Sequence, residues 1–172
     1  MIVKGKAVFL DRDQTLIRGY GSRPANTVEE VELLPSVASG LKILGSAGFT
    51  LVVVSNQGGI GLGYTTADMV RAQNEALNDL LIMEGAPAIE AFIFCPHKPS
   101  EGCECRKPKP GMILTMADMV DLGKSYMVGD AGTDIDAGRA AGVRACFKVE
   151  DDNFMLIAQS IVNIDRGLAC TS

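Results

Sequence analysis

Short runs of consecutive apolar residues recur along the chain, and stretches with helical spacing separate them. The runs cover residues 7–10, 49–54, 88–95, 126–128 and 145–149. Because a strand of a parallel sheet is buried on both faces, it reads as a continuous apolar run. Strands that alternate with helices predict right-handed strand–helix–strand units. The pattern therefore predicts an α/β fold with a doubly wound parallel sheet, in a single domain over residues 1–172.

The first two helices have clear end signals. Pro35 stands at the first helical position of one segment, which Gly48 closes. Thr66 is an expected N-cap for the next segment. Apolar residues with a period near 3.6 then continue to Leu81, which predicts one buried face.

Two further helices are predicted later in the chain. The third would begin at Pro110, and its inward stripe consists of Met112, Ile113, Met116, Met119 and Val120. We interpret this Met-rich stripe as core packing, because Met fills irregular gaps. Thr133 would cap a short fourth helix that ends before Gly142. Residues 154–161 fit a helix or an edge strand, and residues 17–34 lack a period and are expected to form an irregular flap over the site.

Composition narrows the possible functions. The chain has 172 residues, enough for one domain with a real core, with 47% hydrophobic and 22% charged residues. Its net charge of −5 argues against a general polyanion binder such as a nucleic-acid protein. Residues 1–5 are too short and mixed for a signal peptide, and no apolar run approaches the roughly 18 residues of a membrane span. We expect a cytoplasmic monomer that binds neither membranes nor nucleic acid.

Two carboxylates follow the first apolar run directly. Asp11 and Asp13 are spaced i and i+2, so in an extended chain they point the same way. The carboxyl end of a strand is where open α/β sheets bind ligands. Two acids there repel each other unless a cation or a shared proton holds them. The alternative interpretation is a strand followed by an acidic turn.

Other reactive side chains follow strands in the same way. Ser55, Asn56 and Gln57 come directly after the second run, and Asp130 comes after the fourth. Each could by itself be a cap or turn residue. Because the carboxyl ends of the strands meet at one edge, we expect these residues to converge with Asp11.

A stiff basic segment completes the set of groups that phosphoryl transfer requires. Arg106 and Lys107 precede two prolines that fix the backbone. Phosphoryl transfer requires a nucleophile, in-line geometry and positive charge on the transferred oxygens. Asp11 and Asp130 with Mg²⁺ would supply the nucleophile and the clamp, while Lys107 neutralises charge and Ser55 holds phosphate oxygens. Asp13 would protonate the leaving oxygen and then activate water.

The only histidine lies among three of the five cysteines. Cys95 and His97 form one i, i+2 pair, and Cys103 and Cys105 form another. Three thiolates and one imidazole suit tetrahedral Zn²⁺, and no ligand position is left open, so the site should be structural. A reducing compartment favours metal over disulfide. Cys146 is interpreted as a buried strand residue and Cys170 as a tail thiol, and neither is given a function.

The pattern Asp-x-Asp-x-Thr at 11–15 resembles motif one of the haloacid dehalogenase (HAD) phosphohydrolases. The four HAD motifs occur in order across residues 7–136. The resemblance implies Asp11 as nucleophile, Asp13 as acid/base, Ser55 in motif two and Lys107 in motif three. It also implies magnesium ligation by Asp11, Asp130 and the backbone carbonyl of Asp13, with Asp134 behind these ligands.

The segments Cys-Pro-His and Cys-x-Cys-Arg-Lys-Pro resemble one HAD branch closely. This branch contains the D-glycero-D-manno-heptose 1,7-bisphosphate phosphatases and the histidinol-phosphate phosphatases, which have a zinc loop in place of a large cap domain. Residues 56–61 and 107–112 look like the heptose enzymes, whereas the short zinc loop looks like the histidinol enzymes. Gln14 stands where the family usually has Gly, and Ala131 and Leu62 stand where basic residues are common.

The expected function is a magnesium-dependent phosphomonoesterase with an aspartyl-phosphate intermediate and a small phosphorylated metabolite as substrate. The preferred substrate is D-glycero-D-manno-heptose 1,7-bisphosphate, with the 7-phosphate removed. Arg106 would bind the second anionic group bidentately. The substrate-binding set is Ser55, Asn56, Gln57, Arg106 and Lys107. Histidinol phosphate is the alternative substrate, and a nucleic-acid end phosphatase or a non-catalytic zinc-stapled module remain further alternatives.

Overall fold

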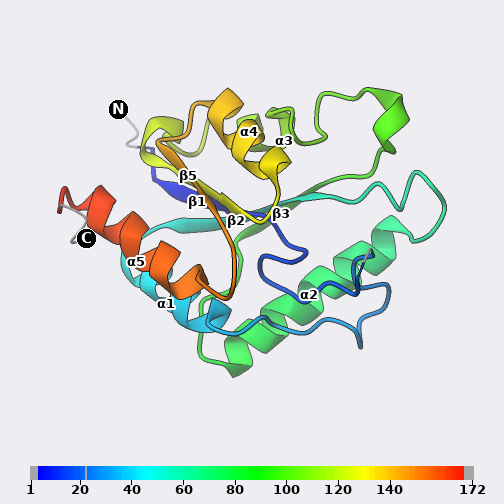
Figure 1. Cartoon of the computed structure of the whole chain (residues 1–172), viewed down its shortest axis with the longest axis horizontal. Coiled ribbons are helices and arrows are strands. Elements are labelled where there is room, and N and C mark those ends of the chain that lie inside the picture. Colours follow the sequence, from blue (N-terminus) through cyan, green and yellow to red (C-terminus); the bar gives the residue numbers. More distant parts are fainter. Residues whose placement is uncertain (1–3, 22, 169–172) are drawn as a thin grey trace.

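A computed structural model describes residues 4–21 and 23–168 and contains a five-stranded, wholly parallel sheet (Figure 1). The strands are β1 (Ala7–Leu10), β2 (Thr50–Asn56), β3 (Ala91–Cys95), β4 (Tyr126–Gly129) and β5 (Ala145–Lys148), in the order β3-β2-β1-β4-β5. The chain first builds outward from β1 to β3 and then returns to the other side of β1. This confirms the predicted doubly wound sheet, and it places β1 between β2 and β4.

Helices cover both faces of the sheet. They are α1 (Val37–Ser46), α2 (Ala67–Met83), α3 (Gly111–Leu114), α4 (Gly132–Ala141) and α5 (Phe154–Asp165), with short 3-10 helices at Pro99–Glu101 and Leu122–Lys124. In Figure 1, α1, α2 and α5 lie on one side of the sheet and α3 and α4 lie on the other. No helix in the described part of the chain is long and apolar enough to cross a membrane.

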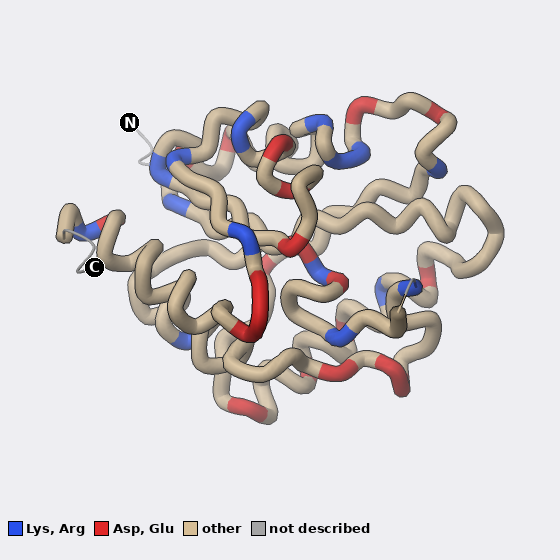
Figure 2. Tube along the Cα trace, in the orientation of Figure 1, with Lys and Arg blue, Asp and Glu red and all other residues tan. Residues whose placement is uncertain are grey.

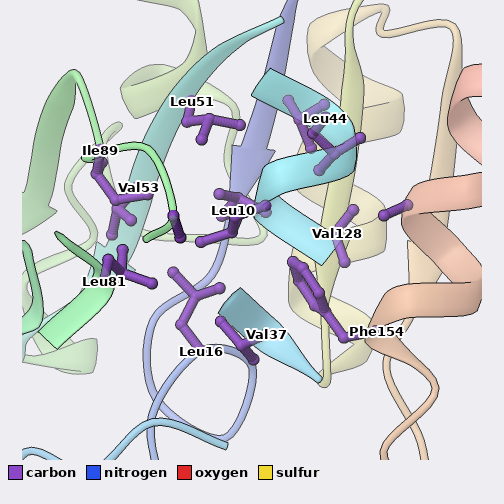
Figure 3. Close-up of a cluster of buried hydrophobic side chains, with 14 of the residues drawn as sticks. Leu10, Leu16, Val37, Leu44, Leu51, Val53, Leu81, Ile89, Val128 and Phe154 are labelled. Carbon is purple, nitrogen blue, oxygen red and sulfur yellow. The ribbon is translucent and has the colours of Figure 1, made fainter. Parts of the chain in front are cut away.

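Alternate residues of β1 enter two separate hydrophobic cores. Val8 and Leu10 pack into the larger core under α1, α2 and α5, part of which Figure 3 shows. Ala7 and Phe9 pack into the smaller core under α3 and α4. Burial of one such aliphatic or aromatic side chain contributes about 1.5–3 kcal/mol, so β1 is anchored from both faces before it reaches its acidic end.

The first two helices begin near the predicted residues. Thr66 is the N-cap of α2, and its side chain accepts a hydrogen bond from the Met69 amide at 3.1 Å, as predicted. The prediction for α1 was wrong by two residues. The helix begins at Val37, because Ser36 takes a left-handed conformation with φ of 60° and breaks the helix after Pro35.

The third and fourth helices differ more from the prediction. The α3 helix is only four residues long, and Met119 is 60% exposed instead of inward-facing. The chain turns after Leu114 so that Val120 can form a parallel bridge with Gly5. The N-cap of α4 is Ala131 rather than Thr133, because the Asp134 carboxylate accepts from the Ala131 amide at 3.0 Å.

Residues 17–21 and 23–34 form the expected irregular flap. Its ends are joined by an antiparallel bridge between Ile17 and Leu33. Its middle is fixed by a hydrogen bond from the Tyr20 hydroxyl to the Glu30 carbonyl. Residue 154 onward is the helix α5 rather than an edge strand. Cys146 lies in β5, as predicted, but it is only partly buried because β5 is the edge strand of the sheet, whereas Cys170 lies outside the described residues.

Candidate active site

Asp11 lies immediately after the central strand, at the edge where all strands end. Its amide donates to the Val128 carbonyl at 2.9 Å, which continues the pairing of β1 with β4 by one residue. The side chain is almost wholly buried. Burial is the main cause that raises the pKa of Asp11 to about 7, Lys107 opposes the rise, and Asp134 adds to it.

Lys107 carries the positive charge closest to Asp11. Its ammonium lies 2.6 Å from Asp11 Oδ1 and 2.6 Å from Asp134 Oδ1, and it donates to the Val54 carbonyl at 2.7 Å. Asn56 clamps the Lys107 backbone, since its amide accepts from the Lys107 N–H at 3.0 Å and donates to the Lys107 carbonyl at 3.1 Å. Asn56 thus fixes the lysine through its main chain, and its predicted contact with substrate stays a prediction.

Three acidic side chains converge at this edge. Oxygen atoms of Asp11, Asp130 and Asp134 lie within 4.8 Å of one another. The single ammonium of Lys107 cannot balance three carboxylates. Burial, followed by the charge of Asp134, raises the pKa of Asp130 as well. Buried oxygen ligands with excess negative charge fit a hard divalent cation such as Mg²⁺, which prefers carboxylates and retained waters.

Asp13 points to a different set of partners from Asp11. The Gln57 amide donates to Asp13 Oδ2 at 2.8 Å, and the Ser55 hydroxyl lies 3.5 Å from the same oxygen. Gln57 also donates to the Ser55 hydroxyl at 2.6 Å. The structure thus brings the predicted residues Asp13, Ser55 and Gln57 into one hydrogen-bonded group beside Asp11.

Two polar residues of the site were missed at the sequence level. Thr15 donates to Asp11 Oδ2 at 3.3 Å and to Asp130 Oδ1 at 3.4 Å, and so bridges two of the acids. Its position in the Asp-x-Asp-x-Thr pattern was the available signal. Arg12 is 1% exposed and contacts Asp13. A cation between two acids at the end of a buried strand was the signal for it.

The four predicted zinc ligands form one cluster. Cys95 Sγ lies 3.5 Å from His97 Nδ1, 3.5 Å from Cys103 Sγ and 3.2 Å from Cys105 Sγ. His97 Nδ1 and Cys105 Sγ are 3.2 Å apart. Zn–S bonds of about 2.3 Å in a tetrahedron place sulfurs about 3.8 Å apart, so the cluster needs little expansion to hold Zn²⁺. The residues present fit this metal.

A cavity of about 640 Å³ opens between the flap, the loop after β2 and the zinc loop. Its walls include Ala25, Asn56, Gln57, Tyr64, Gln73 and Arg106. The Arg106 guanidinium donates to the His97 carbonyl at 3.3 Å, which ties it to the Cys/His cluster. None of the ion pairs found among the described residues includes Arg106. The volume falls in the range of small-molecule sites, about 300–1,000 Å³.

Comparison with known proteins identifies the family. A family model described as polynucleotide kinase 3 phosphatase matches residues 6–161. A protein of Rhodopseudomonas palustris named D-glycero-beta-D-manno-heptose-1,7-bisphosphate 7-phosphatase is 34% identical over 94% of this chain and 93% of its own. The family model and this relative together show that the chain belongs to the HAD phosphatases. A Helicobacter pylori protein of the same name is 37% identical over 84% of this chain and 83% of its own.

Solved structures agree with this assignment to the HAD phosphatases. The crystal structure of D,D-heptose 1.7-bisphosphate phosphatase from B. bronchiseptica, complexed with magnesium and phosphate, superposes with a TM-score of 0.82. It is 26% identical and covers 92% of this chain and 99% of that chain. A putative beta-phosphoglucomutase from Thermotoga maritima, 14% identical with a TM-score of 0.54, shares the fold alone.

Three positions depart from the HAD pattern, and the structure places each of them. Gln14 keeps a left-handed conformation, with φ of 63°, so the turn after the acids is formed despite the missing glycine. Ala131 caps α4 through its backbone, and its methyl side chain offers no positive charge to the site. Leu62 is half exposed and lines the cavity, so this position offers the cavity an apolar side chain and no positive charge.

Proposed function

We propose that the protein is a magnesium-dependent phosphomonoesterase that removes the 7-phosphate of D-glycero-D-manno-heptose 1,7-bisphosphate. The observation that carries the proposal is the buried pair of Asp11 and Lys107 at the end of the central strand. Two relatives with this enzyme name match the chain over more than nine-tenths of their own length, and this similarity supports the proposed substrate. The β-anomer in those names is the one we would test first.

Asp11 is the proposed nucleophile. Its carboxylate attacks phosphorus in line with the leaving oxygen, so that an aspartyl phosphate forms and the P–O bond to the sugar breaks. Lys107 stabilises the charge on the transferred oxygens, and Ser55 with nearby backbone amides holds them. Asp11, Asp130 and the Asp13 carbonyl, with Asp134 behind them, would hold Mg²⁺, which would supply the positive charge that one lysine among three acids does not provide.

Asp13 is the proposed acid and base. It gives a proton to the departing sugar oxygen and afterwards takes one from the water that attacks the aspartyl phosphate. Its carboxylate lies beside the Ser55 and Gln57 side chains rather than in the acid cluster, which keeps it free of the nucleophile. The two carboxylates of motif one therefore have separate tasks because their surroundings differ.

Arg106 is the proposed contact for the second phosphate. It lines the cavity and is held there by the His97 carbonyl. Zinc would be bound by Cys95, His97, Cys103 and Cys105, and would then support substrate binding by fixing His97. Histidinol phosphate would bring a cation toward Arg106 and is therefore disfavoured. The small phosphorylated metabolite would sit in the space between flap and zinc loop.

A nucleic-acid end phosphatase is the second candidate, because the matching family model takes its description from such an activity. The net charge of −5 opposes it. In Figure 2, basic and acidic residues are both spread along the trace of the chain. We infer that a nucleic-acid strand is not the preferred substrate.

The test compares kcat/KM for four substrates: the heptose bisphosphate, the heptose monophosphate, histidinol phosphate and a 3′-phosphorylated oligonucleotide. The proposal expects the bisphosphate to be preferred, and Arg106→Ala to lower its kcat/KM more than that of the heptose monophosphate. A preference for histidinol phosphate or for the oligonucleotide, or an equal loss for bisphosphate and monophosphate with Arg106→Ala, would contradict the substrate assignment. Loss of all turnover in Asp11→Asn with retained fold tests the reaction class separately.

A further inference from the structure

Arg12 is a buried cation to which the proposed reaction gives no task. It stands in the chain between the two acids, and its side chain is 1% exposed. Its Nε lies 3.2 Å from Asp13 Oδ2 and its Nη2 lies 3.2 Å from Asp13 Oδ1. Such a two-point contact fixes both the position and the plane of a carboxylate.

The other end of the guanidinium is anchored in α2. Its Nη1 donates to Gln73 Oε1 at 3.2 Å and to Asn74 Oδ1 at 3.1 Å. Both of these side chains are buried as well. A buried polar network whose members are satisfied is rigid, because each lost bond leaves an unpaired polar group. Arg12 therefore cannot turn away from Asp13 without breaking its bonds to α2.

Gln73 extends the network to the flap. Its Nε2 donates to the Ala25 carbonyl at 2.9 Å and lies 3.4 Å from the Thr27 carbonyl. Asn74 makes no contact of this kind within the described residues. Ala25 and Gln73 both line the cavity proposed for the leaving group. A continuous path thus runs from the cavity wall through Gln73 and Arg12 to Asp13.

We propose that Arg12 is a positioning residue for Asp13, and that Gln73 couples its placement to the flap. The inference rests on the proposed function, in which Asp13 donates the proton that the sugar oxygen needs as the P–O bond breaks. The negative charge left on Asp13 then lies against the guanidinium, which stabilises it until the carboxylate takes a proton from water. A sugar that packs against the flap would thereby stabilise the orientation of the Asp13 carboxyl group.

The test separates proton donation from general structural damage. Arg12→Lys and Gln73→Leu are assayed as full-length, magnesium-loaded protein with an alkyl sugar phosphate and with an aryl phosphate whose phenol needs no proton. Because kcat/KM covers steps up to phosphoenzyme formation, it reports the acid step. Both variants should lower kcat/KM for the alkyl substrate at least about tenfold more than for the aryl substrate, a part of the 10²–10⁴ that general acids contribute.

Asn74→Leu is the matched control. It removes one acceptor from the same Arg12 nitrogen but leaves the flap contact intact, so the ratio of alkyl to aryl kcat/KM should stay within about threefold of wild type. If Gln73→Leu and Asn74→Leu change the ratio equally, the coupling to the flap is wrong. If Arg12→Lys does not fold, as judged by circular dichroism, Gln73→Leu alone decides.

Asp13→Asn in the same assay distinguishes the two levels of failure. Equal loss for both substrates in Asp13→Asn would overturn the acid assignment itself. A selective loss in Asp13→Asn, together with equal loss for both substrates in Arg12→Lys and Gln73→Leu, would leave the proposed function in place and refute the positioning inference.

Discussion

The ammonium of Lys107 lies 2.6 Å from the carboxylate of Asp11, and both groups are buried. The two residues are 96 positions apart in the chain. They meet because Asp11 ends the central strand, while Asn56 at the end of β2 holds the Lys107 backbone. The pair is therefore a product of sheet topology, and the reactive centre and the fold should depend on each other.

Replacement of Lys107 by Met should lower the free energy of unfolding. It leaves Asp11 and Asp134 as buried carboxylates without their shared cation, and such a loss costs about 3–5 kcal/mol. Urea denaturation at pH 7.5 measures the change. Lys109→Met is the control, since that amine is part of an exposed pair with Glu104, and it should change stability by less than about 1 kcal/mol. Equal effects of the two variants would show that the Lys107 contacts do not stabilise the fold.

The stability of the metal-free protein should fall as pH rises from 5 to 7.5. The folded-state pKa of Asp11 is raised to about 7, mainly by burial, so the folded state favours the neutral acid. That contribution is fully present below the unfolded pKa and is lost as pH rises through the folded value. Thermal melting in a chelator should show a smaller decline for Asp11→Asn, and Mg²⁺ should restore wild type at pH 7.5. If Asp11→Asn leaves the fall of the melting temperature with pH unchanged, the raised pKa of Asp11 does not cause it.

Gly129→Ala should damage the site from the strand side. A methyl group at this residue would overlap the Asp134 carboxylate, which accepts from the Ala131 amide and pairs with Lys107. We expect a loss of about 1–3 kcal/mol in stability from overpacking, and a lower kcat. Gly132→Ala is the matched control three residues later, because its methyl would meet nothing within 4 Å. Wild-type activity in Gly129→Ala would show that the exact placement of Asp134 is unimportant.

One zinc per chain should bind at Cys95, His97, Cys103 and Cys105. Cys105→Ser should lower the zinc content and the melting temperature, because metal binding energy is partly folding energy. It should also raise KM, since Arg106 is held by the His97 carbonyl. Cys146→Ser, a cysteine of β5 outside the cluster, should keep the metal. If the wild type can be stripped of zinc without a change in its melting temperature, this account is contradicted.

Local signals made the strands and the acidic end of β1 predictable. An apolar run followed by Asp11 and Asp13 is visible within nine residues, and the sheet then brings Ser55 and Asp130 to the same edge. The zinc cluster was predictable for the same reason, since all of its ligands lie within eleven residues. In both segments, the residue types and their spacing were enough to predict the site without knowledge of contacts to distant residues.

The network around Arg12 could not be predicted, because its partners Gln73 and Asn74 lie about sixty residues away on a helix that reads as ordinary and amphipathic. The exposure of Met119 was missed for a related reason. Its apolar spacing continued the helical period, whereas the bridge between Gly5 and Val120 ended the helix early. Tertiary pairing overrode a correct local pattern in that segment.

The covalent intermediate is the most direct test of the central claim. The protein is mixed with substrate and Mg²⁺, quenched within the first turnover and treated with borohydride, which reduces an acyl phosphate to an alcohol. Mass spectrometry of the peptide that contains Asp11 and Asp13 then locates the change. The account predicts homoserine at residue 11, only when substrate and Mg²⁺ are both present. Reduction at residue 13, or turnover with residue 11 unmodified in every sample, would contradict it.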